Sequence, residues 1–120
     1  MMKFLNNFFK KFKKIQPEDK YTVIITEKFV IVKHPEHNTE VIEWAQLQEI
    51  KLINTDAGPW APDIWLTLTD IGSTCFIPHG SEGFDKVFAI VSKYKGFRLE
   101  NVTKSMASTE NAEFLLWERQ

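Results

Sequence analysis

The order of hydrophobic patterns along the chain restricts the fold more than any other feature. Between residues 21 and 77, short runs rich in β-branched and aromatic residues follow one another, and no run with helical spacing separates them. Parallel strands need a crossover connection of a dozen or more residues, which is usually a helix. The sequence therefore predicts antiparallel strands in this part of the chain.

Six strands are predicted here, over residues 21–26, 29–34, 39–44, 48–55, 64–69 and 74–77. Residues 45–47 break the alternation of apolar and polar side chains, which indicates a bulge or a corner. Nearly every residue of the second strand is apolar. We therefore expect that strand to be central, with both faces covered or with one face covered by the N-terminal segment.

The spacing changes after residue 81 to that of an amphipathic helix, with the apolar stripe Phe84, Val87, Phe88, Val91 and Tyr94. Ser81 suits the N-cap and Gly96 suits the end, so a helix is predicted over residues 81–95. Residues 99–106 predict a second short helix, and residues 114–117 predict a last strand, with a helical turn as the alternative. The predicted fold is α+β, with an antiparallel curved sheet or partly open barrel of about six to seven strands and an amphipathic helix toward the C-terminus.

Charge is distributed unevenly along the chain. Residues 1–16 hold five lysines and no acid, whereas residues 17–120 hold ten basic and sixteen acidic residues, a formal charge of −6. Such a body does not suit the phosphate backbone of nucleic acids, so no nucleic-acid partner is expected. The single cysteine excludes an internal disulfide and a cysteine-rich zinc module.

The basic segment 1–16 is predicted to be an amphipathic helix that ends before Pro17, ahead of a single domain over residues 17–120. Its apolar face could pack on this domain, on another protein chain or on an anionic membrane surface. The membrane alternative uses Phe4, Phe8, Phe12, Lys10, Lys11, Lys13 and Lys14. The apolar residues are too interrupted for a signal peptide and too few for a transmembrane helix.

Residues with reactive side chains form weak patterns. His34 and His37 flank Glu36 at a spacing that metal ligands use, but the proline and asparagine around them are typical of a solvated turn. Cys75 and His79 resemble a nucleophile and base, yet in an extended chain their Cα atoms lie roughly 13 Å apart. We therefore expect no catalytic residue, no metal site and no cofactor.

The irregular segment 56–63 carries the residues most suited to binding. Asp56 and Asp63 either cap turns or supply paired carboxylates. Trp60, between two prolines, either anchors the loop in the core or forms an exposed contact for a partner. Trp44, Trp65 and Trp117 lie in patterned strands, where core or half-buried positions are expected.

Two stretches resemble known sequences. Residues 24–34 and 41–50, IITEKFVIVKH and VIEWAQLQEI, are similar to the opening of bacterial pleckstrin-homology-like domains, with their I-x-W-x-x-L-x-x-I rhythm. Residues 55–63, 97–101 and 108–117, TDAGPWAPD, FRLEN and STENAEFLLW, resemble signature stretches of a family of small bacterial proteins. The resemblance implies a pleckstrin-homology-like fold and brings no activity with it.

The predicted function is therefore a non-enzymatic, cytoplasmic protein-binding module, with Trp60 as anchor and with Asp56 and Asp63 beside it. An immunity-type inhibitor is one concrete form, by analogy with other small acidic inhibitors. The first alternative is a membrane-peripheral adaptor that uses the basic segment. A phosphoinositide pocket is not supported, since the first hairpin offers only Lys28 and Lys33 beside Glu27. The second alternative is a hydrolase or metal-dependent enzyme.

Overall fold

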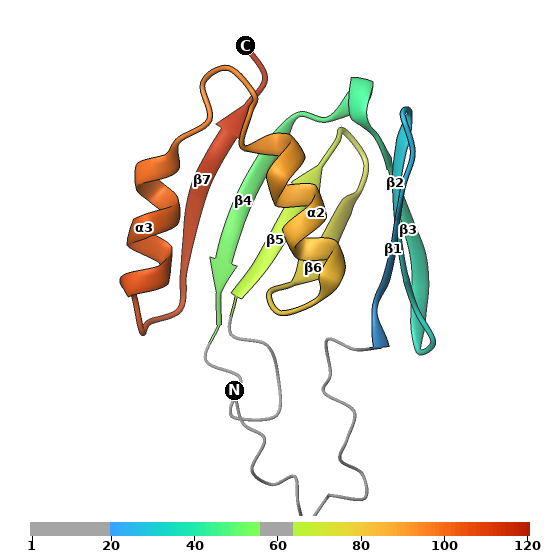
Figure 1. Cartoon of the computed structure of the whole chain (residues 1–120), viewed down its shortest axis with the longest axis horizontal. Helices are drawn as coiled ribbons and strands as arrows, with labels where there is room; N and C mark the ends of the chain where they lie inside the picture. The colour runs from blue at the N-terminus through green and yellow to red at the C-terminus, as the bar shows by residue number, and fades with distance from the viewer. Residues whose placement is uncertain (1–19, 56–63) are drawn as a thin grey trace, which may run out of the picture.

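A computed structural model describes residues 20–55 and 64–120. Within these ranges the chain forms seven strands and two α-helices, so the predicted α+β class is confirmed (Figure 1). The strands are β1 (Thr22–Ile25), β2 (Phe29–His34), β3 (His37–Glu43), β4 (Glu49–Asn54), β5 (Ile64–Thr69), β6 (Thr74–Pro78) and β7 (Ala112–Glu118). The helices are α2 (Glu82–Val91) and α3 (Leu99–Ala107), and a short 3₁₀ turn, η2, covers Trp44–Gln46.

The strands form two antiparallel sheets instead of one curved sheet or barrel. The three-stranded sheet has the order β1-β2-β3, and the four-stranded sheet has the order β6-β5-β4-β7. The predicted interruption at residues 45–47 is the corner where the chain passes between the sheets. There Trp44 Nε1 donates a hydrogen bond to Thr26 O at 3.0 Å, and Arg119 Nε donates to Leu47 O at 2.7 Å.

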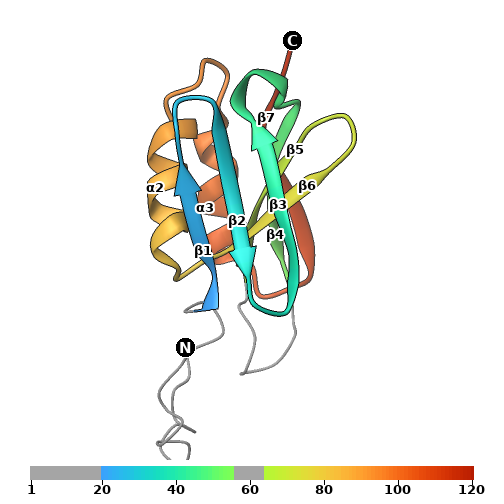
Figure 2. The same cartoon turned by 90° about the vertical axis from the view of Figure 1, so that its right-hand side faces the viewer.

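The three-stranded sheet stands across the β6 edge of the four-stranded sheet (Figures 1 and 2). This arrangement creates two corners, one on each face of the four-stranded sheet. Helix α2 fills one corner, where it packs against β1 and β6, and α3 lies on the same side against β7 and β4. The resulting core contains Val30, Val32, Ile42, Leu47, Ile50, Leu52, Leu66, Leu68, Cys75, Ile77, Phe84, Val87, Val91 and Leu116.

Local sequence signals explain the helix ends and the last strand. Phe84 N donates to Ser81 Oγ at 3.2 Å, which confirms the predicted N-cap of α2. Gly96, in the turn between the helices, has a φ of 88°, a backbone conformation that favours glycine. The second short helix and the strand over residues 114–117 are also confirmed, as α3 and β7.

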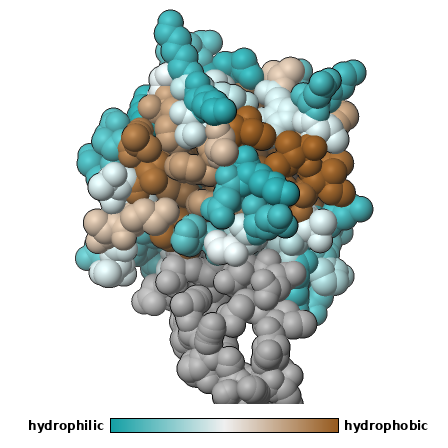
Figure 3. Space-filling model, viewed as in Figure 1, coloured by the Kyte–Doolittle hydropathy of each residue, from teal (hydrophilic) through white to brown (hydrophobic). Residues whose placement is uncertain are grey.

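A buried polar pair fixes α3 to the sheet. Asn54 Nδ2 donates to Ser105 O at 2.9 Å, and Ser105 Oγ donates to Asn54 Oδ1 at 2.6 Å. Both residues are buried, so their mutual hydrogen bonds replace those lost from water. The surface on this helix-bearing side is mixed, with hydrophobic patches on both sides of a hydrophilic stripe (Figure 3).

Strand β2 is central, as predicted, but only one of its faces is covered within the described residues. Val30 and Val32 lie in the core. On the other face, Ile24, Ile31 and Val41 are aligned across the three strands, and Ile24 and Val41 are 37% and 45% exposed. The alternative cover, the predicted N-terminal helix, lies outside the described residues.

The close approach of α2 to β1 generates a prediction about Gly83. A Cβ atom at this buried position would overlap the side chain of Val23. We expect Gly83→Ala to lower the free energy of unfolding by about 1–3 kcal/mol, because overpacking outweighs the gain in helix propensity of roughly 1 kcal/mol. Urea unfolding measures the change.

Gly72→Ala is the matched control, because nothing lies within 4 Å of the added Cβ in that turn. Its effect should stay within about 0.5 kcal/mol. Combining Gly83→Ala with Val23→Ala should recover part of the loss. A Gly83→Ala variant as stable as the wild type would contradict the packing of α2 on β1.

Candidate functional site

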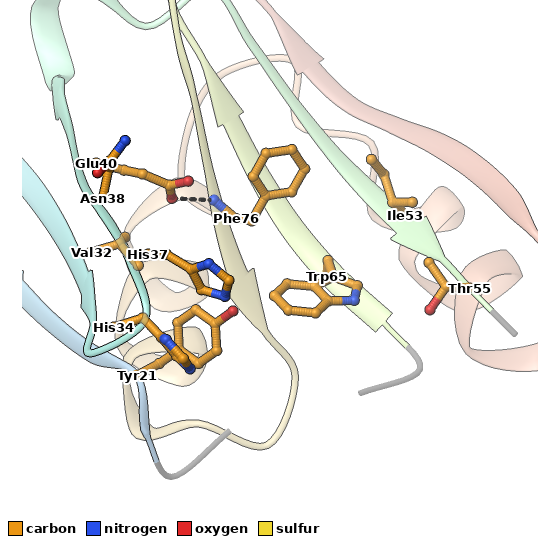
Figure 4. Close-up of a pocket in the computed structure, with 10 residues that line it drawn as sticks. All are labelled: Tyr21, Val32, His34, His37, Asn38, Glu40, Ile53, Thr55, Trp65 and Phe76. Carbon is orange, nitrogen blue, oxygen red and sulfur yellow. Dashed lines mark hydrogen bonds between the residues drawn. The ribbon is translucent and has the colours of Figure 1, made fainter. Parts of the chain in front are cut away.

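The second corner between the sheets is an open cleft of about 550 Å³. It lies where β2 and β3 approach the face of the four-stranded sheet opposite α2 and α3. Strand alternation explains this position, since Cys75 and Ile77 of β6 face the core while Phe76 faces the cleft. The lining residues in the described ranges are Tyr21, Val32, His34, His37, Asn38, Glu40, Ile53, Thr55, Trp65 and Phe76 (Figure 4).

Three aromatic rings line the cleft at steep angles to one another. The ring centroids of Tyr21 and Trp65 are 5.8 Å apart with an interplanar angle of 76°. Those of Trp65 and Phe76 are 6.5 Å apart with an angle of 81°. Tyr21 directly precedes β1 of the three-stranded sheet, whereas Trp65 lies on β5 and Phe76 on β6. The three rings therefore line one space between the two sheets (Figure 4).

Glu40 supplies the acidic group of the cleft. Its Oε1 accepts a hydrogen bond from Phe76 N at 3.0 Å, so it caps a backbone N–H on the outer edge of β6. Burial raises the pKa of the Glu40 carboxyl, and the Phe76 N–H and the nearby His37 oppose this rise. Burial also raises the pKa of the Tyr21 hydroxyl, and the charge of Glu40 adds to this effect.

The two histidines of the β2–β3 turn lie at the mouth of the cleft. The turn itself is confirmed, and Glu36 N donates to His34 Nδ1 at 3.0 Å. His37 is exposed, as the prediction of a solvated turn requires, whereas His34 is half-buried. The ring of His34 lies 4.6 Å from that of Tyr21 and 4.4 Å from that of His37.

Metal chemistry finds no support in residues 20–55 and 64–120. No group of three or more histidine, cysteine, aspartate or glutamate side chains there is arranged to hold a metal ion.

Neither α-helix in residues 20–55 and 64–120 has the length and apolar character needed to cross a membrane.

The structure does not bring Cys75 and His79 together as a catalytic pair. Cys75 is 0% exposed and faces the core, whereas His79 is exposed beyond the end of β6, with its ring 4.8 Å from that of Phe84. Burial raises the pKa of the Cys75 thiol to about 12, and the charges of Glu40 and Asp70 add to this rise. The thiolate needed for nucleophilic attack is therefore strongly disfavoured.

Both sets of residues predicted to bind a partner or a membrane lie outside the described residues. The first set is Trp60, Asp56 and Asp63, and the second is the segment 1–16 with its phenylalanines and lysines. Sequence reasoning missed the cleft, although one signal pointed to it. Trp65 shares its side of β5 with Thr67 and Thr69, opposite the apolar side that enters the core.

No protein-family model matches the chain, and neither a curated protein nor a solved structure matches it. The side chains of the cleft therefore carry the functional conclusion.

The burial of Cys75 predicts a chemically inert thiol. We expect iodoacetamide at mildly alkaline pH to leave the folded chain almost unmodified, because the thiol is inaccessible and protonated. In denaturant the same reagent should add one group, since the chain has one cysteine. Intact mass spectrometry follows both reactions, and rapid alkylation of the folded chain would show that the thiol is accessible.

The raised pKa of Glu40 predicts how stability depends on pH. Ionisation of this carboxyl costs stability in the folded chain. The cost is complete above the folded-state pKa and disappears as pH falls through it toward the ordinary value of 4.5. Glu40→Gln keeps an oxygen for Phe76 N and carries no charge, so it should be more stable than the wild type near neutral pH.

This advantage of Glu40→Gln should shrink as pH falls toward 4.5. Urea unfolding at a series of pH values measures it. Glu27→Gln, at an exposed position in the turn at the other end of the three-stranded sheet, is the matched control for the loss of one negative charge. A Glu40→Gln variant whose stability advantage grows on acidification would contradict the predicted direction of the pH dependence.

Proposed function

We propose that the chain is a non-catalytic protein-binding module and that its partner places a side chain in the cleft between the two sheets. The observation that carries this proposal is the wall of three inclined aromatic rings, Tyr21, Trp65 and Phe76, beside the carboxylate of Glu40. Phe76 is 40% exposed, so apolar surface remains open to a partner. Tryptophan and tyrosine are enriched among the residues that dominate binding energy at protein interfaces.

The charge of the body supports a basic partner. Residues 17–120 carry a formal charge of −6, which favours encounter with a positively charged surface. A small inhibitor that neutralises a basic protein, as immunity proteins do, is one concrete form of this function, by analogy.

The polar groups of the cleft support binding over catalysis. Glu40 Oε1 is occupied by the backbone of Phe76, and His34 Nδ1 accepts from the backbone of Glu36. These bonds hold the two side chains in place and occupy the atoms that would act as base. A hydrolase or metal-dependent enzyme is therefore not favoured.

We also propose a relationship to pleckstrin-homology-like domains. Two antiparallel sheets with an amphipathic helix packed between them support it, together with the resemblance of residues 24–34 and 41–50. The chain departs from that pattern after its helices, where β7 returns to pair with β4. An experimentally determined structure of the full chain tests this relationship.

The function is tested by affinity capture from cells of the organism that encodes the chain. We expect the wild type to retain a basic protein, and Trp65→Ala to lower its affinity at least 30-fold, about 2 kcal/mol. Ile71→Ala is the control, because Ile71 is 89% exposed in the β5–β6 turn and does not line the cleft. Circular dichroism confirms that each variant is folded.

Equal recovery of the partner by the wild type and Trp65→Ala would remove the cleft from the binding surface. Trp60→Ala in the same assay tests the loop that the sequence predicts as an anchor. Loss of the partner with Trp60→Ala alone would place binding on the 56–63 segment instead.

A further inference from the structure

We propose that the cleft is an aromatic cage for an organic cation, the ammonium or guanidinium group at the end of a basic side chain. The identification of the carrier as a protein rests on the proposed function, whereas the preference for a cation follows from the cleft itself.

The aromatic rings provide the first part of the cage. The ring of Trp65 meets that of Tyr21 at 76° and that of Phe76 at 81°, so neither neighbour stacks flat on Trp65 and all three line the space. The faces of aromatic rings carry partial negative charge and attract cations, tryptophan most strongly. Rings around one space, as in the sites that bind alkylammonium ligands, replace part of the water that the cation loses.

Glu40 provides the charge that a cation requires. Its Oε1 accepts from Phe76 N, and no other donor in the described residues bonds to its carboxylate. Oε2 is therefore open to a donor from a ligand. No lysine or arginine occurs among the described residues that line the cleft, so the half-buried Glu40 carboxylate has no permanently charged cation beside it, and the basic side chains there are the imidazoles of His34 and His37.

Lys51 of β4, on this face of the four-stranded sheet, is paired with two acids. Lys51 Nζ lies 2.9 Å from Glu113 Oε1 and 3.7 Å from Glu49 Oε1. Glu113 is on β7, on the side of β4 away from β5 and β6. Both acids paired with Lys51 lie outside the cleft lining, and Lys51 itself is not among the described residues that line the cleft.

The alternatives fit the cleft less well. An anion would face Glu40 and the negative faces of the rings, with no lysine or arginine among the described lining residues to bind it. A metal ion would need a set of ligands that the described residues do not assemble. A cavity of about 550 Å³ is of the size that takes a small ligand or a side chain with its stem.

The cation is tested with small probes and the full chain, so that no partner needs to be known. Nα-acetyl-lysine methylamide is compared with the norleucine derivative, which lacks only the ammonium group. Nα-acetyl-arginine methylamide is compared with the citrulline derivative, which is its uncharged analogue. Titrations followed by ¹H–¹⁵N NMR report on the Trp65 indole N–H and the Phe76 backbone N–H.

We expect at least one of the two charged probes to shift both signals and to bind at least tenfold more tightly than its neutral analogue. Glu40→Gln should weaken that probe about tenfold, while Glu27→Gln, with the same change of charge at the far end of the sheet, should leave it unchanged. Trp65→Phe should retain part of the affinity and Trp65→Leu should lose it, because leucine keeps apolar bulk without an aromatic face.

Equal binding of charged and neutral probes, no shift at Trp65 and Phe76, or full affinity in Glu40→Gln would each overturn the cage. The two proposals fail separately. If partner capture survives Trp65→Ala while the charged probe still binds, the cleft holds a cation that is not the captured partner's. If partner capture depends on Trp65 but each charged probe binds no more tightly than its neutral analogue, the protein-binding function is supported and the cation site is refuted.

Discussion

The packing of the three-stranded sheet across the edge of the four-stranded sheet is the interaction on which the rest of the structure depends. A three-stranded sheet of this size cannot bury its apolar face alone. Val30, Val32 and Ile42 do so against β6 and α2, and α2 approaches β1 so closely that only a glycine fits at residue 83. The corner filled by α2 therefore determines how the two sheets are oriented.

The cleft follows from the same orientation. Helix α2 fills only one of the two corners, and among the described residues the other corner is an open cleft on the far side of β6. There the edge of β6 presents an N–H group that a neighbouring strand does not satisfy, and the Glu40 side chain accepts its hydrogen bond. A carboxylate that stabilises a sheet edge thus also places negative charge among aromatic rings, which links the stability of this corner to its binding chemistry.

The predictions from sequence succeeded where the signal was local. The bounds of β2 and β5, the capping of α2 by Ser81 and the corner near Trp44 all follow from patterns within a few residues. The prediction of one curved sheet was wrong, since β3 and β6 lie at facing edges without backbone pairing and the strands form two sheets that do not close into a barrel. The prediction of a solvated turn holds for the exposed His37, but nothing local to the turn indicates that the ring of Tyr21 packs against His34.

The sequence by itself determined the strands, the two helices of the described chain and the acidic body, since alternation, helical spacing and charge are properties of neighbouring residues. Only the tertiary structure decided that seven strands divide into two sheets and that Tyr21, Glu40, Trp65 and Phe76 surround one cleft. These side chains lie on or beside four different strands of two sheets. Their meeting depends on the angle at which one sheet crosses the edge of the other, and that angle arises from packing across the whole core.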